Sequence, residues 1–345
     1  MTSFKKRRVG KTSLEVTEFG FGSATLAGMN GTVVSPDQAR ATVTSALDAG
    51  VGYFDTAPHY GFGRAEHFIG DALRYREDGV VLSTKVGRLL RPVRTEKDRT
   101  VDNPWTQAFP FEIAYDYSYG GIMRSFEDSL QRLGLAKIDI LLVHDIGVQT
   151  HGVDGNKKHW ADLAGGHKAL QELKTKGLVQ AIGLGVNEAP ALMDALELGD
   201  WDVFLIANRY NLLEQAVLDP LFSNCQKRGT SVIAAGPFAA GILAGTNVWG
   251  PPNGAYMPPP AAVMERVMAL RALASTHNVP LAAAALQFAL AHPVICNVLT
   301  GPKTPVELKQ NLEWWETAIP DGFWSDLATA RLVAPGTPLP NGQTA

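Results

Sequence analysis

Four polar residues of this chain end or follow apolar segments, and their side chains form a set suited to moving a proton. Asp55, Lys85 and His144 each close an apolar run typical of a β-strand, and Tyr60 lies just beyond Asp55. A tyrosine hydroxyl exchanges a proton more readily when a nearby lysine lowers the pKa of the phenol and a carboxylate holds that lysine. A histidine beside them can bind and polarise the same substrate oxygen. Such a set suits hydride transfer at a carbon bearing a hydroxyl or carbonyl oxygen, because the oxygen must lose or gain a proton in step.

Apolar runs recur along the whole chain, with helix-like segments between them. They lie at 19–22, 51–55, 80–85, 138–144, 179–185, 202–207, 231–235 and 294–299. Strands that alternate with helices pair in parallel, and eight such units predict an α/β fold, a closed (β/α)8 TIM barrel. The carboxyl ends of the strands line the mouth of such a barrel, where functional residues gather. Taken singly, each of the four residues could have a purely structural role, as a loop cap, a packed side chain, a solvated strand end or a buried histidine with its hydrogen bonds satisfied. The predicted fold brings all four to one face, which favours a catalytic role.

Three segments outside this rhythm are predicted to cover the barrel. Residues 1–18 carry turn signals between β-prone pieces and predict an N-terminal β-hairpin that plugs the bottom. Residues 88–120 are rich in aromatic residues and predict a long loop at the C-terminal face that forms a substrate wall. Residues 245–260, with several prolines, predict a stiff lid. The alternative is that both loops fold their aromatic side chains onto the barrel as local core.

We expect one barrel domain over residues 1–332 and a flexible C-terminal tail over 333–345, where the apolar pattern stops. The chain has 31 Lys and Arg against 34 Asp and Glu, a net charge of -3, and no basic stripe, so nucleic acid is not an expected partner. No export signal or apolar run long enough for a membrane span is found. Cys225 and Cys296 are expected to be buried free thiols in the cytoplasm. An assembly of several copies is compatible with the sequence.

Several motifs in the same order resemble those of the aldo-keto reductase family over residues 7–320. They are FDTAPHYG at 54–61, SLQRLG at 129–134 and DILLVH at 139–144. Within that family, the motifs around Tyr60 and His144 look most like the branch of aldose 1-dehydrogenases, including fucose dehydrogenase, and pyridoxal 4-dehydrogenase. The resemblance implies a (β/α)8 barrel, a nicotinamide cofactor extended across its mouth, and a catalytic tetrad of Asp55, Tyr60, Lys85 and His144.

The resemblance also implies cofactor contacts from the loops that follow the strands. They are Gly22, Asn187, Asn208, Gly236, Pro237, Phe238, Gly241, Leu243, Gly301, Lys303, Thr304, Glu307, Gln310 and Asn311. The chain departs from the family at some of these positions. Asn208 stands where a glutamine is usual, and Ala235 replaces the aromatic residue that commonly stacks on the nicotinamide.

Glu307 is the departure that bears on the choice of cofactor. Phosphate-binding members of the family place a lysine and an arginine where this chain has Gly301 and Glu307. A carboxylate repels a 2′-phosphate and can accept hydrogen bonds from ribose hydroxyls, so we expect NAD to be preferred over NADP. Lys303 is the counter-argument, because its ammonium could contact a phosphate. The alternative is that Glu307 is only a surface residue of a helix.

The leading functional hypothesis is an enzyme that oxidises an aldose at its anomeric carbon, from lactol to lactone, with NAD as the hydride acceptor. The predicted substrate contacts are His59, Trp105, Tyr119 and Trp249. Oxidation of pyridoxal and reduction of a general aldehyde are the enzymatic alternatives, since aromatic faces stack on sugars and pyridine rings alike. A nucleotide-binding regulatory barrel is the non-enzymatic alternative. Unrelated lyase or hydrolase chemistry is less favoured, and the histidine spacing predicts no metal site.

Overall fold

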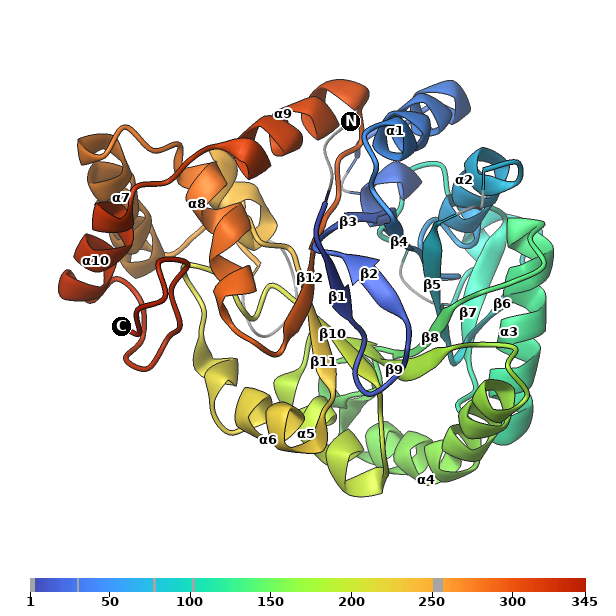
Figure 1. The fold of residues 1–345 in the computed structure, drawn as a ribbon. Helices are drawn as coiled ribbons and strands as arrows, with labels where there is room; N and C mark the ends of the chain where they lie inside the picture. Colours follow the sequence, from blue (N-terminus) through green and yellow to red (C-terminus); the bar gives the residue numbers. More distant parts are fainter. Residues whose placement is uncertain (1–3, 30, 77–78, 101–102, 251–256) are drawn as a thin grey trace.

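The structure, a computed structural model, describes residues 4–29, 31–76, 79–100, 103–250 and 257–345. Within these residues, eight parallel strands close into a barrel surrounded by helices (Figure 1). The barrel strands are β3 (Phe19–Gly22), β4 (Tyr53–Asp55), β5 (Val81–Val86), β8 (Ile140–His144), β9 (Ala181–Val186), β10 (Val203–Ala207), β11 (Ser231–Ala235) and β12 (Ile295–Thr300). They follow one another round the barrel in chain order, and β12 pairs with β3 to close it. The predicted (β/α)8 fold is confirmed.

The helices follow the strands and form the outer layer. They are α1 (Pro36–Asp48), α2 (Arg64–Leu73), α3 (Tyr119–Leu133), α4 (Val148–Thr175), α5 (Ala189–Leu198), α6 (Leu221–Arg228), α7 (Ala261–Thr276), α8 (Leu281–Phe288), α9 (Pro305–Glu316) and α10 (Asp321–Thr329). Helix α1 begins where the Ser35 hydroxyl accepts a hydrogen bond from the backbone N–H of Gln38, 3.1 Å away. Helix α3 ends at Gly134, whose left-handed φ of 61° stops the helix as glycine does.

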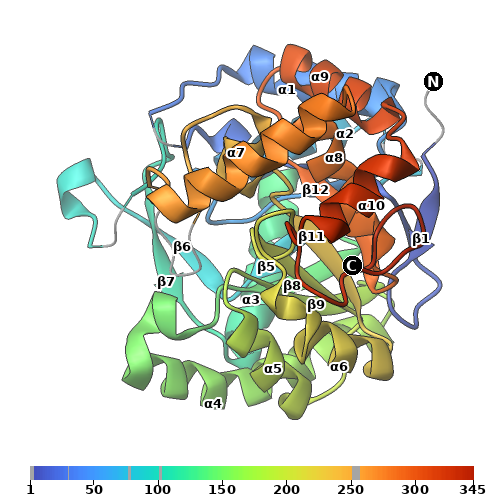
Figure 2. The ribbon, with the colours of Figure 1, turned by 90° about the vertical axis from the view of Figure 1, so that its left-hand side faces the viewer.

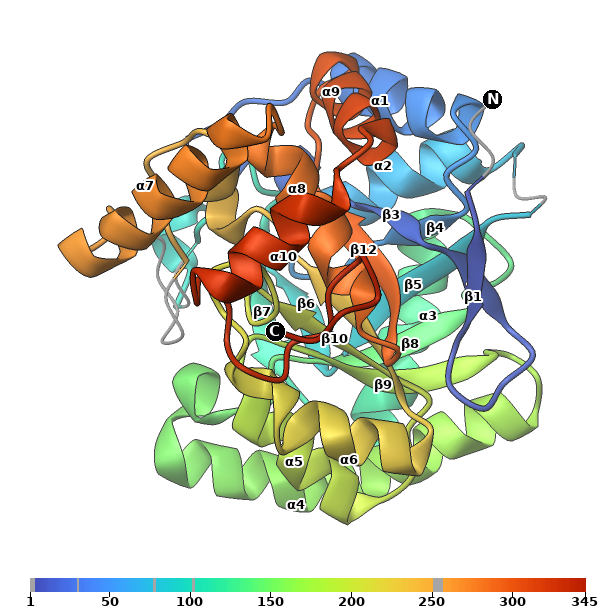
Figure 3. The same cartoon turned by 60° about the vertical axis from the view of Figure 1, so that its left-hand side comes forward.

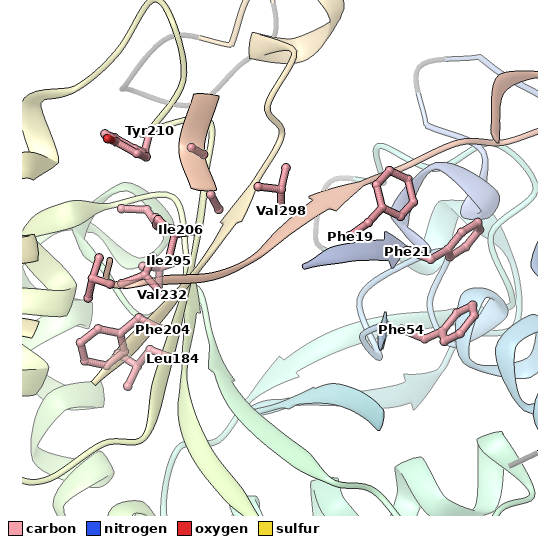
Figure 4. Packing of buried hydrophobic residues seen from close by; sticks show 14 of the residues in the cluster. Phe19, Phe21, Phe54, Leu184, Phe204, Ile206, Tyr210, Val232, Ile295 and Val298 are labelled. Atoms are coloured by element: carbon pink, nitrogen blue, oxygen red, sulfur yellow. The ribbon is translucent and has the colours of Figure 1, made fainter. Parts of the chain in front are cut away.

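Side chains alternate between the two sides of the barrel wall, because successive residues of a strand face opposite ways. Outward-facing residues pack beneath the helices, as with Phe21 and Phe54, whose rings lie 5.6 Å apart between β3 and β4. On the neighbouring strands β9 to β11, Leu184, Phe204 and Val232 pack together in the same outer layer (Figure 4). This packing fixes which residues point into the barrel.

A short antiparallel hairpin closes the amino end of the barrel, as predicted. Strands β1 (Lys6–Arg8) and β2 (Glu15–Thr17) pair, and Val9, Leu14 and Val16 pack against the apolar residues inside the barrel. The backbone N–H of Gly10 donates to the hydroxyl of Ser231, the first residue of β11, at 2.8 Å. Figure 2 shows this hairpin at the opposite end of the molecule from β6 and β7. The carboxyl ends of the strands are therefore left as the open mouth.

The segment after β5 is a second hairpin, which corrects the prediction of a loop over residues 88–120. Strands β6 (Arg88–Pro92) and β7 (Phe111–Tyr115) pair antiparallel, and α3 already begins at Tyr119. Phe111, Ile113 and Tyr115 alternate with Glu112 and Ala114, which suits a strand with one apolar face, and these three apolar side chains belong to one packed cluster. Among the residues described in the loop between the two strands, Trp105 is buried, so the segment contributes both core and wall.

The C-terminal residues pack on the barrel rather than forming a flexible tail. Val333 and Leu339 are buried, and the backbone N–H of Ala334 donates to the Gln215 side chain at 3.0 Å. Figure 3 shows this segment folded back beside α10, where Gln343 accepts from Ser325 at 3.0 Å. The sequence did not predict this packing, because two isolated apolar residues, Val333 and Leu339, form no periodic pattern. The centre of the predicted lid, 251–256, lies outside the described residues.

Two further expectations concern thiols and membranes. Cys225 and Cys296 are both buried and free, as predicted. No helix in the described part of the chain combines the length and apolar character that crossing a bilayer requires.

Candidate active site

The inward positions at the carboxyl ends of neighbouring strands bring three of the predicted catalytic residues together. Asp55 is the last residue of β4 and His144 the last of β8, while Lys85 is the penultimate residue of β5. Strand β5 lies between β4 and β8, so all three side chains meet on one side of the mouth. Each is at most 4% exposed. The polar cluster thus lies where the barrel interior opens toward solvent.

Asp55 and Lys85 form a buried ion pair that is held from several directions. The Lys85 ammonium donates to Asp55 Oδ2 at 2.7 Å and to the carbonyl of Thr56 at 2.9 Å. The other carboxylate oxygen accepts from the Ser83 hydroxyl at 2.7 Å, and Ser83 in turn contacts the Tyr53 hydroxyl at 2.8 Å. A buried charge needs such partners, because burial without them is costly. The lysine is therefore fixed in place, as the sequence predicts.

Tyr60 lies over this ion pair. The Lys85 ammonium is 4.8 Å from the centre of the Tyr60 ring. Burial is the dominant influence and raises the pKa of the Tyr60 phenol to about 12, although Lys85 by itself lowers it; Asp55 adds to the increase. Lys85 thus acts on the phenol in the predicted direction, but the net pKa of Tyr60 is raised. Burial outweighs the lysine, and the carboxylate of Asp55 opposes the lysine further.

His144 faces Tyr60 across the mouth, with ring centres 5.7 Å apart. Burial, followed by the positive charges of Arg88 and Lys85, lowers the pKa of His144 well below its ordinary value. The imidazole is therefore uncharged near neutral pH. Its Nδ1 atom is buried and has no hydrogen-bond partner among the described residues.

Arg88 is a site residue that the sequence analysis did not identify. It begins β6, is 4% exposed, and its Nη2 donates to Asp145 Oδ2 at 2.8 Å. The same carboxylate oxygen lies 3.5 Å from Nε2 of His144. A polar residue three positions after Lys85, immediately beyond a predicted strand, was the available signal. The assignment of 88–120 to a loop concealed it.

Tyr117 supports the backbone at the end of β8. Its hydroxyl donates to the carbonyl of His144 at 2.8 Å and contacts Nε2 of His151 at 3.0 Å. The Tyr117 ring packs so close to Gly87 that a Cβ there would lie 2.4 Å from it, and Gly87 has a φ of 94°. Glycine at position 87 therefore leaves space for the Tyr117 ring. The Tyr117 hydroxyl in turn holds the backbone of His144 in position.

The predicted substrate residues do not lie together: two are beside the tetrad, one lines a separate cavity and one is on the outer surface. The rings of His59 and Trp105 lie beside the tetrad, with centres 5.3 Å from each other and, for Trp105, 5.7 Å from Tyr60. Trp249 lines a separate cavity of about 100 Å³ on the other side of the mouth. Tyr119 corrects the prediction: it starts α3 on the outer surface, and its hydroxyl donates to Glu172 of α4 at 2.7 Å.

The loops after β10 and β11 meet at the predicted cofactor residues. Asn208 has a φ of 58°, and its side-chain oxygen accepts from the backbone N–H of Ala240 at 3.2 Å. It lines the cavity that also contains Trp249. The carbonyl of Asn187, after β9, accepts from Arg209 Nε at 2.9 Å. Side-chain and backbone contacts thus tie these three loops into one wall.

The remaining predicted cofactor residues belong to two adjoining segments, the loop after β11 and the segment that leads from β12 into α9. Phe238 packs against Trp314 of α9 with ring centres 5.6 Å apart, and Leu243 is buried in the core. The backbone N–H of Gly236 donates to the carbonyl of Leu299 at 3.2 Å, which places the loop after β11 beside the end of β12. The other members of these segments are Pro237, Gly241, Gly301, Lys303, Thr304, Gln310 and Asn311.

Glu307 is part of the start of helix α9. The Thr304 hydroxyl accepts from the backbone N–H of Glu307 at 3.0 Å, and the Glu307 carboxylate accepts from the backbone N–H of Lys303 at 2.9 Å. The Lys303 ammonium lies 3.8 Å from the same carboxyl group. Glu307 therefore caps the helix and partly neutralises Lys303 at the position where the sequence predicts the adenosine end of the cofactor.

The mouth has the features expected of a site for an extended polar ligand. The hydroxyls of Ser23, Thr25 and Thr56, which follow β3 and β4, are buried and have no hydrogen-bond partner in the described part of the chain. A Cβ on Gly22 would approach the Leu299 side chain to 3.3 Å, so glycine leaves room for this side chain where β3 and β12 end. Together with the cavity beside Asn208, these features fit a bound dinucleotide.

Comparison with known proteins identifies the family. The model of the aldo/keto reductase family matches residues 18–331, and the chain belongs to this family. It is 42% identical to pyridoxal 4-dehydrogenase of Microbacterium luteolum, over 96% of this chain and 98% of that protein. It is 35% identical to D-threo-aldose 1-dehydrogenase of a Pseudomonas species, over 93% and 95% of the two chains. These relatives confirm the branch that the motifs resemble.

A solved structure confirms the fold independently. An aldo-keto reductase of Bacillus halodurans in its holo form superposes with a TM-score of 0.72 at 24% identity, covering 99% of this chain and all of that one. Aldo-keto reductases are oxidoreductases that use nicotinamide cofactors, so the class of reaction follows from the family.

Proposed function

We propose that this chain is an NAD-dependent dehydrogenase that oxidises the anomeric carbon of an aldose from lactol to lactone. The observation that carries the proposal is the position of Tyr60 beside His144 and above the buried pair of Asp55 and Lys85. Pyridoxal is the second candidate substrate. Its cyclic hemiacetal undergoes the same reaction, and the 42% identity to a pyridoxal 4-dehydrogenase favours it.

In the proposed reaction, the C–H bond at the hemiacetal carbon breaks, and its electron pair leaves with the hydrogen. The hydroxyl on that carbon becomes the carbonyl of the lactone, and its proton passes to the Tyr60 oxygen. Lys85 stabilises the phenolate that accepts this proton, and Asp55 keeps the ammonium beneath the ring. His144 and Trp105 bind the substrate next to Tyr60.

A nicotinamide dinucleotide, when bound, supplies the acceptor for the hydride. We expect Asn208, the loop that begins at Gly236 and the start of α9 at Thr304 to hold it.

The buried free cysteines favour a reducing compartment, so we propose that the protein acts in the cytoplasm.

A panel of substrates tests the proposal. Purified protein with NAD is supplied with fucose, arabinose, galactose, other aldoses and pyridoxal, and NADH formation is recorded with the product identified by mass spectrometry. We expect a lactone from at least one aldose. Turnover of pyridoxal alone would select the second candidate, whereas reduction of aldehydes without any oxidation would contradict both.

The preference for NAD over NADP is proposed to depend on Glu307. Replacing Glu307 with glutamine removes the charge that would repel a 2′-phosphate and frees the Lys303 ammonium from its partner. We expect kcat/KM with NADP to rise about ten-fold relative to NAD, equivalent to about 1.4 kcal/mol. Steady-state kinetics with both cofactors measures this ratio.

Glu197→Gln is the control, because Glu197 is an exposed residue of α5 that lies 3.7 Å from Arg228 and outside the predicted cofactor residues. It should leave the ratio unchanged. A wild-type enzyme that uses NADP at least as well as NAD would show that Glu307 acts only as a helix cap.

A further inference from the structure

Trp105 lies beside the reacting groups but on a segment that belongs to no helix or extended strand. Residues 103–110 lead into β7, and Trp105 alone among them is buried. Its ring centre is 5.7 Å from that of Tyr60 and 5.3 Å from that of His59. Irregular segments take their shape from contacts with their neighbours, because no ladder of hydrogen bonds fixes them. The place of the Trp105 ring therefore depends on what holds residues 103–110.

Arg64 ties this segment to the rim of the barrel. It is the first residue of α2 and is 6% exposed. Its Nη1 donates to the carbonyl of Thr106, the residue after Trp105, at 3.3 Å, and its Nη2 donates to the carbonyl of Val34 at 2.6 Å. The guanidinium also lies 5.0 Å from the centre of the Phe68 ring. The planar fork of one arginine thus bridges two carbonyls that belong to separate loops.

Thr106 is held on both sides of its Cα atom. Its N–H, in the peptide unit shared with Trp105, donates to the carbonyl of Gly28 at 2.6 Å. Its carbonyl, in the next peptide unit, accepts from Arg64. Without the arginine, this second peptide unit would lose the contact that fixes its orientation, and the carbonyl of the fully buried Val34 would lose a donor.

We propose that Arg64 is a positioning residue for the reaction: by bridging Val34 and Thr106 it holds the Trp105 ring beside Tyr60, where the ring packs against the substrate. A large aromatic face contributes to binding only where it is held in contact with its ligand. The inference rests on the proposed function, in which Trp105 binds the substrate. It adds a residue of α2 that acts on the substrate only through Trp105.

The backbone of Tyr60 is held independently of the Arg64 side chain. The N–H of Tyr60 donates to the carbonyl of Ala57 at 3.2 Å, and its carbonyl accepts from the N–H of Ala65 at 3.1 Å. The ammonium of Lys85 lies beneath the Tyr60 ring whether or not the arginine is present. Loss of the Arg64 side chain should therefore weaken substrate binding and leave the proton transfer in place.

Steady-state kinetics of Arg64→Gln, with the best substrate of the panel, tests this separation. We expect KM for the substrate to rise about ten-fold, as when one hydrogen bond to a charged group is lost, while kcat and KM for NAD change by less than about two-fold. An unchanged KM for the substrate would overturn the proposal, as would a fall in kcat without a rise in that KM.

Arg7→Gln is the matched control for a purely structural effect. Arg7, on β1, also donates to two backbone carbonyls, those of Leu290 at 3.0 Å and Ile295 at 2.9 Å, but at the closed end of the barrel. Its loss should lower the melting temperature and leave kcat and both KM values unchanged. An equal rise in KM for the substrate in Arg7→Gln and Arg64→Gln would overturn the proposal.

A double-mutant cycle tests whether Arg64 acts through Trp105. Trp105→Ala should raise KM for the substrate by itself, and adding Arg64→Gln should raise it little further. Residues that act through one shared contact do not have additive effects. If the two increases instead multiplied in the double variant, Arg64 would act on the substrate by another route, and the proposal would be overturned.

Fluorine-19 NMR of the full-length protein labelled with 5-fluorotryptophan follows Trp105 without any substrate. The spectrum of Trp105→Phe identifies its resonance. Arg64→Gln should shift or broaden this resonance, and Arg7→Gln should not. Gly28→Ala serves if Arg64→Gln does not fold: Gly28 has a φ of 85°, and a Cβ there would lie 2.7 Å from the Thr106 carbonyl oxygen, so the segment must move.

An unmoved Trp105 resonance in Arg64→Gln, or in Gly28→Ala where it replaces that variant, would overturn the proposal. A wild type that turns over no substrate of the panel would instead contradict the proposed function. The fluorine spectrum would then still decide whether Arg64 holds the Trp105 ring in place.

Discussion

Tyr60→Phe is expected to lower kcat by about 10²- to 10⁴-fold, the range typical of losing a general acid or base. The substitution removes only the hydroxyl, so the ring can keep its contacts with Trp105 and His144. Substrate binding, measured as KM, should change much less than kcat. Steady-state kinetics on the best substrate of the panel, with a thermal unfolding curve to show that the variant is folded, measures the effect.

The pH dependence of oxidation follows from the same residue. Burial raises the pKa of Tyr60 to about 12, so the phenol is protonated near neutral pH. Oxidation needs the phenolate to accept a proton, and the fraction of phenolate increases as the pH rises toward the pKa. The oxidation rate should therefore increase with pH through the alkaline range, while reduction, which uses the phenol as a donor, should not. Tyr60→Phe should lose this dependence.

Tyr119→Phe is the matched control, because it removes another tyrosine hydroxyl whose partner, Glu172, lies on the outer surface. Its kcat should equal that of the wild type. If Tyr60→Phe retained full activity and the wild-type pH profile, the proton would have to move through another group.

Lys85→Met is expected to have the largest effect on stability. The substitution leaves the Asp55 carboxylate buried without its cation, at a site where the two side chains are 1% and 3% exposed. Removing one partner of a buried ion pair typically lowers the free energy of unfolding by about 3–5 kcal/mol. Activity should fall as well, since nothing then stabilises the Tyr60 phenolate. Denaturant unfolding at fixed pH, together with kcat of the folded fraction, measures both effects.

Lys158→Met is the control, because it removes the lysine of an ion pair with the same nitrogen–oxygen distance. Lys158 and Asp162 also lie 2.7 Å apart, but their side chains are 72% and 32% exposed. Such pairs contribute about 0–1 kcal/mol, because water and salt screen them. A loss of stability no greater for Lys85→Met than for Lys158→Met would show that Asp55 does not depend on the lysine.

The sequence was sufficient to predict the barrel because each strand is a short apolar run bounded by polar or turn residues. The same runs identified Asp55, Lys85 and His144, since strand periodicity turns these residues inward where their strands end. The hairpin of β6 and β7 was missed because its residues lack a long apolar run. Tyr119 was wrongly predicted to contact the substrate for a different reason. It lies in an aromatic segment, and the sequence pattern did not show that helix α3 begins there.

Properties that depend on several distant residues could not be predicted from the sequence. The pKa of Tyr60 depends on how deeply the phenol is buried and on the partial cancellation between Lys85 and Asp55. The pairing of Arg88 with Asp145 joins two strand ends far apart in the chain. Neither feature has a local pattern, whereas the motif around Tyr60 does.

Transfer of deuterium from the substrate tests the central claim most directly. An aldose of the panel is labelled with deuterium at its anomeric carbon and oxidised with NAD, and both products are examined by mass spectrometry. We expect an unlabelled lactone, the label in the reduced nicotinamide, and slower turnover than with unlabelled substrate. Label retained in the sugar product or released to water would contradict it.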